Sequence, residues 1–88
     1  MNEQTILEML KVDLGAMTDA YNTRFRQYIQ YAKQEIEREG VKTLGSGDEQ
    51  LVAMYAAWLW RKRDSGEGMG RMLRYLLNNR IISEKAHG

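Results

Sequence analysis

Basic side chains are concentrated in the last third of this 88-residue sequence. Arg61, Lys62 and Arg63 are consecutive, and Arg71, Arg74 and Arg80 follow. Residues 1–60 carry six Lys or Arg against nine Asp or Glu, a formal charge of −3, whereas residues 61–88 carry seven against three, a charge of +4. Such cations can pair with the phosphates of nucleic acid or with carboxylates of a neighbouring copy, or can cap a helix C-terminus. Charge alone leaves these alternatives open.

Other reactive side chains are scarce. The sequence has no cysteine, which excludes disulfides and thiolate metal sites, and its single histidine, His87, stands next to the C-terminus without partner ligands. We expect His87 to be solvated. No nucleophile–base pair, carboxylate dyad or phosphate-binding loop is evident. We therefore expect no enzymatic activity, no catalytic residue, no metal and no cofactor.

The basic cluster follows a continuous apolar stretch, residues 51–60, that is too short to cross a bilayer. Its Ala, Leu and Met content favours a helix, predicted from about residue 47 to 63, with Ser46 as N-cap and Glu49 as its capping-box partner. One broad side of this helix is predicted to be core and consists of Leu51, Met54, Tyr55, Trp58 and Leu59. The other side carries alanines and Trp60. Trp60 is predicted to pack under the last helix of its own chain, or to face a partner chain.

Three further helices are predicted from hydrophobic periodicity and capping residues. The first spans residues 2–14, with Asn2 as N-cap and Gly15 as C-terminal stop. The second spans residues 20–39, with Thr18 or Asp19 as cap and Gly40 at its end. Its apolar stripe is Tyr21, Phe25, Tyr28, Ile29, Ala32 and Ile36. The main core is predicted between this stripe and the large side of the central helix.

The last helix is predicted over residues 69–82, after a glycine-rich turn. Its apolar stripe is Met69, Met72, Leu73, Leu76 and Leu77. Arg80 falls on that stripe, so it must reach solvent or find an acidic or carbonyl partner. A polar tail, residues 83–88, is expected to be mobile until a partner orders it. The sequence thus predicts an all-α fold, a single small domain over residues 1–82 with about four helices.

The stretch from Tyr55 to Arg63, followed by residues 69–75 and 77–80, resembles the phage head–tail connector (adaptor) family of tailed bacteriophages and prophages. Residues 10–15, the Ile29–Ala32 pattern and the Glu39–Gly40 ending are also similar to that family. The resemblance covers nearly the whole chain through diffuse helical motifs. One departure is Gly70, where relatives often carry proline, which leaves the start of the last helix less fixed.

The resemblance implies a structural virion protein without catalytic residues. It would bind the portal protein after DNA packaging, extend the channel for phage DNA and offer a docking surface for the stopper or tail-completion protein. It would form a ring with itself, commonly a dodecamer. Its location would be the neck of the virion and, during assembly, the host cytoplasm, in agreement with an N-terminus without a secretion signal. No membrane partner is expected.

Candidate site residues follow from these hypotheses. Subunit-interface or channel candidates are Trp60, Arg61, Arg63, Arg71, Arg74 and Arg80. Portal-binding candidates are Ile81, Ile82, Ser83, Glu84 and Lys85. The alternative function is a small helical DNA-binding module that uses the basic region 61–80. If copies assemble, the lopsided charge favours a head-to-tail contact between the acidic residues of 1–60 and the basic residues of 61–80.

Overall fold

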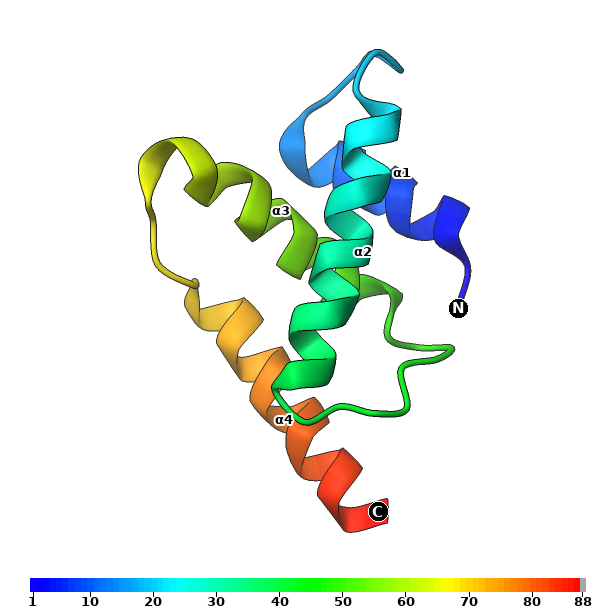
Figure 1. Cartoon of the computed structure of the whole chain (residues 1–88), viewed down its shortest axis with the longest axis vertical. Coiled ribbons are helices and arrows are strands. Elements are labelled where there is room, and N and C mark those ends of the chain that lie inside the picture. Colours follow the sequence, from blue (N-terminus) through cyan, green and yellow to red (C-terminus); the bar gives the residue numbers. More distant parts are fainter. Residues whose placement is uncertain (88) are drawn as a thin grey trace.

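The computed structural model describes residues 1–87, and Gly88 and the side chain of His87, with the expected solvation of that side chain, lie outside the described part. The chain folds into α1 (Glu3–Leu14), α2 (Asn22–Arg38), α3 (Glu49–Ser65) and α4 (Arg71–His87), as Figure 1 shows. No strand occurs within residues 1–87. The prediction of an all-α, single small domain with four helices is confirmed.

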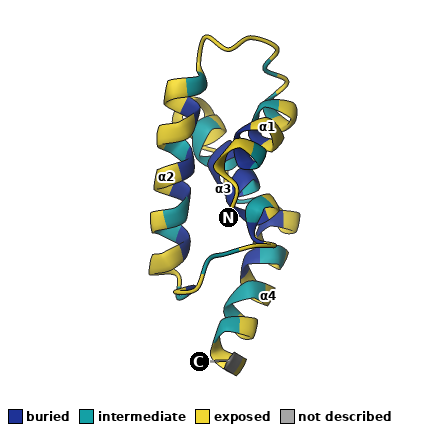
Figure 2. Cartoon of the chain, turned by 90° about the vertical axis from the view of Figure 1, so that its right-hand side faces the viewer, coloured by how far each residue is buried: buried dark blue, intermediate teal, exposed yellow. Residues whose placement is uncertain are grey.

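The central position of α3 is also confirmed. This helix contacts each of the other three helices, with α2 across one side and α1 on another (Figures 1 and 2). The buried side chains of α1 and α2 point toward it. They are Ile6, Leu7, Leu10, Phe25, Ile29, Ala32 and Ile36. The predicted core omitted the contribution of α1, although its periodicity was recognised.

The prediction of which side of α3 is core was only partly right. Ala56 and Ala57 are completely buried, whereas Trp58 and Leu59 are half-buried. Because α1 and α2 both cover α3, the small alanine side chains lie where neighbouring helices approach most closely. An apolar run without periodicity does not show which side will be covered most tightly.

Trp60 packs against α2, and the prediction that it lies under the last helix is wrong. Its ring centroid lies 4.8 Å from that of Phe25, 5.1 Å from that of Tyr28 and 6.2 Å from that of Tyr21, in edge-to-face arrangements. Such pairs stabilise beyond their area burial. Tyr21, predicted as core, is 50% exposed at the margin of this aromatic cluster.

The ends of α1 agree with prediction. The Asn2 side chain accepts a hydrogen bond from the Thr5 amide at 3.1 Å, and Gly15 ends the helix with a left-handed φ of 68°. The predicted caps of α2 are wrong: the helix begins at Asn22, its N-cap residue is Tyr21, and no side chain caps its first backbone amides. The Asp19 carboxylate instead pairs with Lys11 of α1.

The predicted capping box of α3 is also wrong, because α3 begins at Glu49 and its N-cap residue is Asp48. The Glu49 carboxylate accepts from the amide of Gly47 at 2.8 Å rather than from Ser46, and Ser46 is exposed. Gly47 has a φ of 95°, which favours glycine and turns the chain back on itself. Asp48 is thereby left to face α4.

The last helix is longer than predicted. It continues to His87 instead of ending at residue 82, so residues 83–87 are helical here. Leu73 and Leu77 are buried against the core, but Met72, predicted on the apolar stripe, is 62% exposed. In Figure 1 the second half of α4 extends beyond the other helices, along the 40 Å long axis of the molecule.

Candidate functional site

The basic cluster at the end of α3 is occupied by contacts within the chain. Arg61 lies 3.5 Å from a carboxylate oxygen of Asp13 and 3.4 Å from one of Glu67. Lys62 lies over the ring of Trp58, and Arg63 over the ring of Trp60, 3.8 Å from its centroid. Cations over aromatic faces are attracted by the ring quadrupole. These residues therefore act first as a cap that ties α3 to α1 and to the following turn.

Arg71 and Arg74 differ from that cluster. Both are exposed on α4, and within residues 1–87 neither forms an ion pair or a side-chain hydrogen bond. Tyr75 and Ile82 lie on the same side of the helix and are 57% and 64% exposed. We call the exposed set Arg71, Arg74, Tyr75, Ile82 and Lys85 the α4 outer face.

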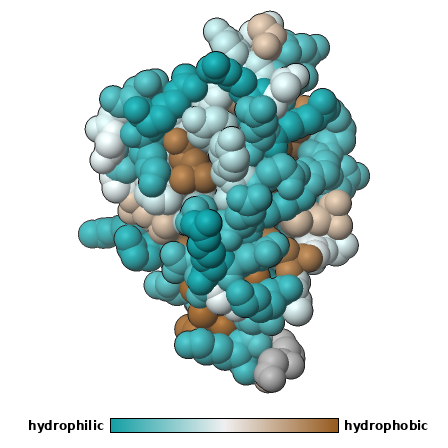
Figure 3. All heavy atoms as spheres, viewed as in Figure 1, coloured by the Kyte–Doolittle hydropathy of each residue, from teal (hydrophilic) through white to brown (hydrophobic). Residues whose placement is uncertain are grey.

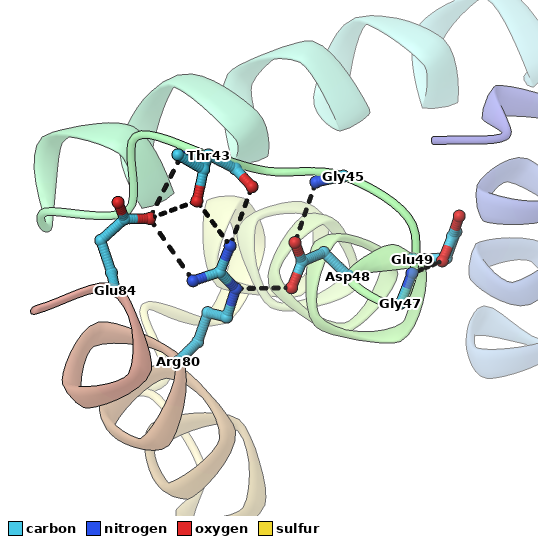
Figure 4. A network of polar contacts seen from close by, with 7 residues as sticks. All are labelled: Thr43, Gly45, Gly47, Asp48, Glu49, Arg80 and Glu84. Carbon is cyan, nitrogen blue, oxygen red and sulfur yellow. Dashed lines mark hydrogen bonds and ion pairs between the residues drawn. The ribbon is translucent and has the colours of Figure 1, made fainter. Parts of the chain in front are cut away.

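Arg80 connects three segments of the chain (Figure 4). Its Nε donates to Asp48 Oδ1 at 2.8 Å, and its Nη2 donates to the Thr43 carbonyl at 2.9 Å. The Glu84 carboxylate lies 3.4 Å from Nη1. The prediction that Arg80 finds an acidic or carbonyl partner is confirmed on both counts. Because it is engaged inside the chain, Arg80 is poorly placed for an interface or channel.

Glu84 completes this network from the next turn of α4. One of its carboxylate oxygens accepts hydrogen bonds from the Thr43 hydroxyl at 2.7 Å and from the Thr43 amide at 3.1 Å. The hydrogen bond from the Thr43 side chain, with help from the Arg80 charge, lowers the pKa of Glu84 below its usual value of 4.5. The hydrogen bond to Asp48 raises the pKa of Arg80. Residues 83–87 are thus anchored by a contact that sequence periodicity gave no reason to expect.

The lowered pKa of Glu84 predicts a loss of stability in acid. The folded state binds its proton less readily than the unfolded state, so this contribution is present above about pH 4.5 and is lost as the pH falls through the lower, folded-state pKa. The variant Glu84→Gln should therefore show a shallower fall of Tm between neutral and acidic pH. Thermal melts followed by circular dichroism measure it. Glu37→Gln is the control, because Glu37 is exposed on α2 and makes no side-chain hydrogen bond among the described residues. A Glu84→Gln profile parallel to wild type contradicts the assignment.

The portal-binding candidates occupy the projecting end of α4. Ile81 is half-buried against the core and Glu84 is held by Thr43, whereas Ile82, Ser83 and Lys85 are exposed. The structure therefore separates two residues that fasten the helix from three that are accessible to a partner.

A groove between α1 and α3 was not predicted. It has a volume of about 730 Å³. The lining of this α1–α3 groove is Thr5, Glu8, Met9, Val12, Asp13, Gln50, Ala53 and Met54. Val12 is 83% exposed and Met9 40% exposed. The sequence did contain a signal for this groove. Met9 and Val12 are apolar residues of a short helix whose other apolar residues are sufficient to form its buried side.

Several other kinds of site can be assessed from the described residues. Within them, no group of three or more His, Cys, Asp or Glu is arranged to hold a metal ion. None of their helices combines the length and apolar character needed to span a membrane. The face of the molecule in Figure 3 is mostly hydrophilic and is interrupted by separate apolar patches.

Comparison with protein-family models, with curated proteins and with solved structures finds no match for this chain.

Proposed function

We propose that this chain is a structural assembly protein, a phage head–tail connector that binds the portal after DNA packaging and extends the DNA channel. In this role it forms a ring with its own copies and presents a docking surface for the stopper or the tail. The proposal rests on the resemblance of residues 55–80 to that family, and the four-helix fold agrees with it.

The observation that carries the proposal is the distribution of partnered and unpartnered charge. Most cations between residues 61 and 80 are engaged inside the chain, whereas Arg71 and Arg74 project from α4 without partners among the described residues. On α1, the one side-chain hydrogen bond of Glu8 among the described residues comes from Gln4, at 3.4 Å. Surfaces of opposite charge on different helices favour association between copies of the chain, rather than a reaction carried out within one copy.

A DNA-binding module is the second candidate, supported by the same two arginines. A free chain that offers only these two to a duplex neutralises about two phosphates, so log K should fall with log salt with a slope of about −2. A protein that contacts many phosphates of a duplex has a much steeper slope and a measurable affinity at physiological salt. For this chain we expect a weak affinity for duplex DNA and a shallow dependence of that affinity on salt.

The test is co-purification with the portal protein encoded in the same genome, with duplex DNA binding measured in parallel. The connector assignment predicts a stable complex with assembled portal rings and only weak DNA binding by the free chain. The variant Ser83→Arg, at an exposed portal-binding candidate on the projecting end of α4, should weaken capture. The control Tyr31→Asp, at an exposed aromatic on α2, should not. Tight duplex binding without portal capture would reject the connector in favour of the DNA-binding module.

A further inference from the structure

The lining of the α1–α3 groove combines apolar and acidic side chains. Met9 and Val12 of α1 and Met54 of α3 provide apolar surface, and Glu8 and Asp13, which we call the acidic rim, belong to the same lining. Asp13 already pairs with Arg61, whereas Glu8 forms no ion pair within residues 1–87 and accepts a hydrogen bond from the Gln4 side chain. Methionine side chains adapt to varied partners because they are unbranched and polarizable. The groove is thus suited to a helix that combines an apolar stripe with flanking cations.

The α4 outer face has that composition. Tyr75 and Ile82 are seven residues apart, which places them on the same side of the helix, and Arg71, Arg74 and Lys85 flank them. α4 has 17 residues, which corresponds to a length of about 25 Å. Its opposite side is fixed to the rest of the chain through Leu73, Leu77 and Arg80. The outer face therefore cannot turn inward to cover a surface of its own copy.

We propose that the α4 outer face of one copy docks in the α1–α3 groove of the next copy, with Tyr75 and Ile82 against Met9, Val12 and Met54. Arg74 then lies beside the acidic rim formed by Glu8. This refines the expected contact between the acidic and basic parts of the chain, and it moves the acceptor surface from Trp60, which is packed on α2, to α1. The inference rests on the proposed function only for the claim that the chain assembles with itself.

The charges select a head-to-tail contact. A two-fold contact made through either surface alone would place that surface against itself, so arginines would face arginines or the acidic rim would face itself. When the outer face of one copy occupies the groove of the next, the first copy keeps a free groove and the second keeps a free outer face. Such a contact repeats, and it closes into a ring when the rotation between neighbours allows it.

Cross-linking between two different single-cysteine variants tests the contact. Val12→Cys marks the groove and Tyr75→Cys marks the outer face, at exposed positions of a chain without native cysteine. Each variant is prepared alone with a different tag, and the two are mixed at high concentration and oxidised. The proposal predicts that the mixed disulfide dominates over both same-variant dimers. Dominant same-variant dimers overturn it in favour of a two-fold contact, and random yields or no cross-link overturn it altogether.

Exchanging the charges of Glu8 and Arg74 gives a second test, and a folding defect would not produce its expected result. Glu8→Arg in the Val12→Cys chain, or Arg74→Glu in the Tyr75→Cys chain, should each reduce the mixed disulfide about two- to fivefold, the range for an exposed ion pair. The two exchanged chains together should restore it. The control is Glu37→Arg, at an exposed acidic position on α2 away from the groove. No portal is present in these cross-linking experiments, so the absence of the mixed disulfide rejects the contact between copies. If the mixed disulfide forms but the portal is not captured, the connector assignment alone is rejected.

Discussion

Replacing Phe25 with alanine is expected to lower the free energy of unfolding by about 3 to 5 kcal/mol, the range for truncating a buried aromatic side chain. Phe25 is only 2% exposed, and its ring meets that of Trp60 edge-to-face at 4.8 Å. The substitution therefore leaves a cavity where α2 and α3 meet. A domain of 88 residues has a total stability of roughly 4 to 13 kcal/mol, so this one change removes a large part of it.

Urea unfolding followed by circular dichroism measures the loss. Tyr21→Ala is the matched control, because Tyr21 lies in the same aromatic cluster but is half exposed. It should cost about 1 kcal/mol, the value of an aromatic pair at the margin of a core. Equal losses for the two variants would show that the aromatic cluster is not packed on α2 as described.

Arg80→Ala is expected to cost about 2 to 4 kcal/mol, because it leaves the carboxylate of Asp48 without its cation. Asp48 is 8% exposed, and after the change its remaining partner is the Gly45 amide at 2.9 Å. The network also holds the 41–47 loop and the second half of α4 together (Figure 4). We therefore expect faster hydrogen exchange in both segments, with the α1–α2 contact unchanged.

Arg74→Ala serves as the control on the same helix, since its side chain is exposed and unpaired within residues 1–87. A surface substitution of this kind should change the free energy of unfolding by less than about 0.5 kcal/mol. The account of Arg80 fails if Arg80→Ala is as mild as Arg74→Ala, or if exchange increases equally throughout the chain.

The sequence was sufficient to predict α1, α2 and the fold class. The period of 3.6 residues gives α2 a clear apolar stripe, and Asn2 and Gly15 are specific caps of α1. It was insufficient for α3, whose apolar run is continuous. Only the positions of α1 and α2 determine that Ala57 is buried more deeply than Trp58. The place of Trp60 was missed for the same reason.

The candidate site shows a similar division. An arginine on an apolar stripe needs an acidic or carbonyl partner, so the existence of a partner for Arg80 could be predicted, but not its identity. Glu84 was assigned to the polar tail, so its contact with Thr43 was not expected. Both contacts join residues more than 30 positions apart, which no local pattern encodes. The α1–α3 groove depends on how two helices diverge and was likewise inaccessible.

We propose that copies of this chain assemble head-to-tail on a portal ring, and native mass spectrometry of the portal complex tests this assembly most directly. The predicted result is a closed ring of many copies in one fixed ratio to the portal subunits, lost in the doubly charge-reversed variant Arg71→Glu/Arg74→Glu while circular dichroism shows that this variant remains folded. A complex that carries isolated copies or two-fold dimers, or rings that form normally from the folded double variant, would contradict it.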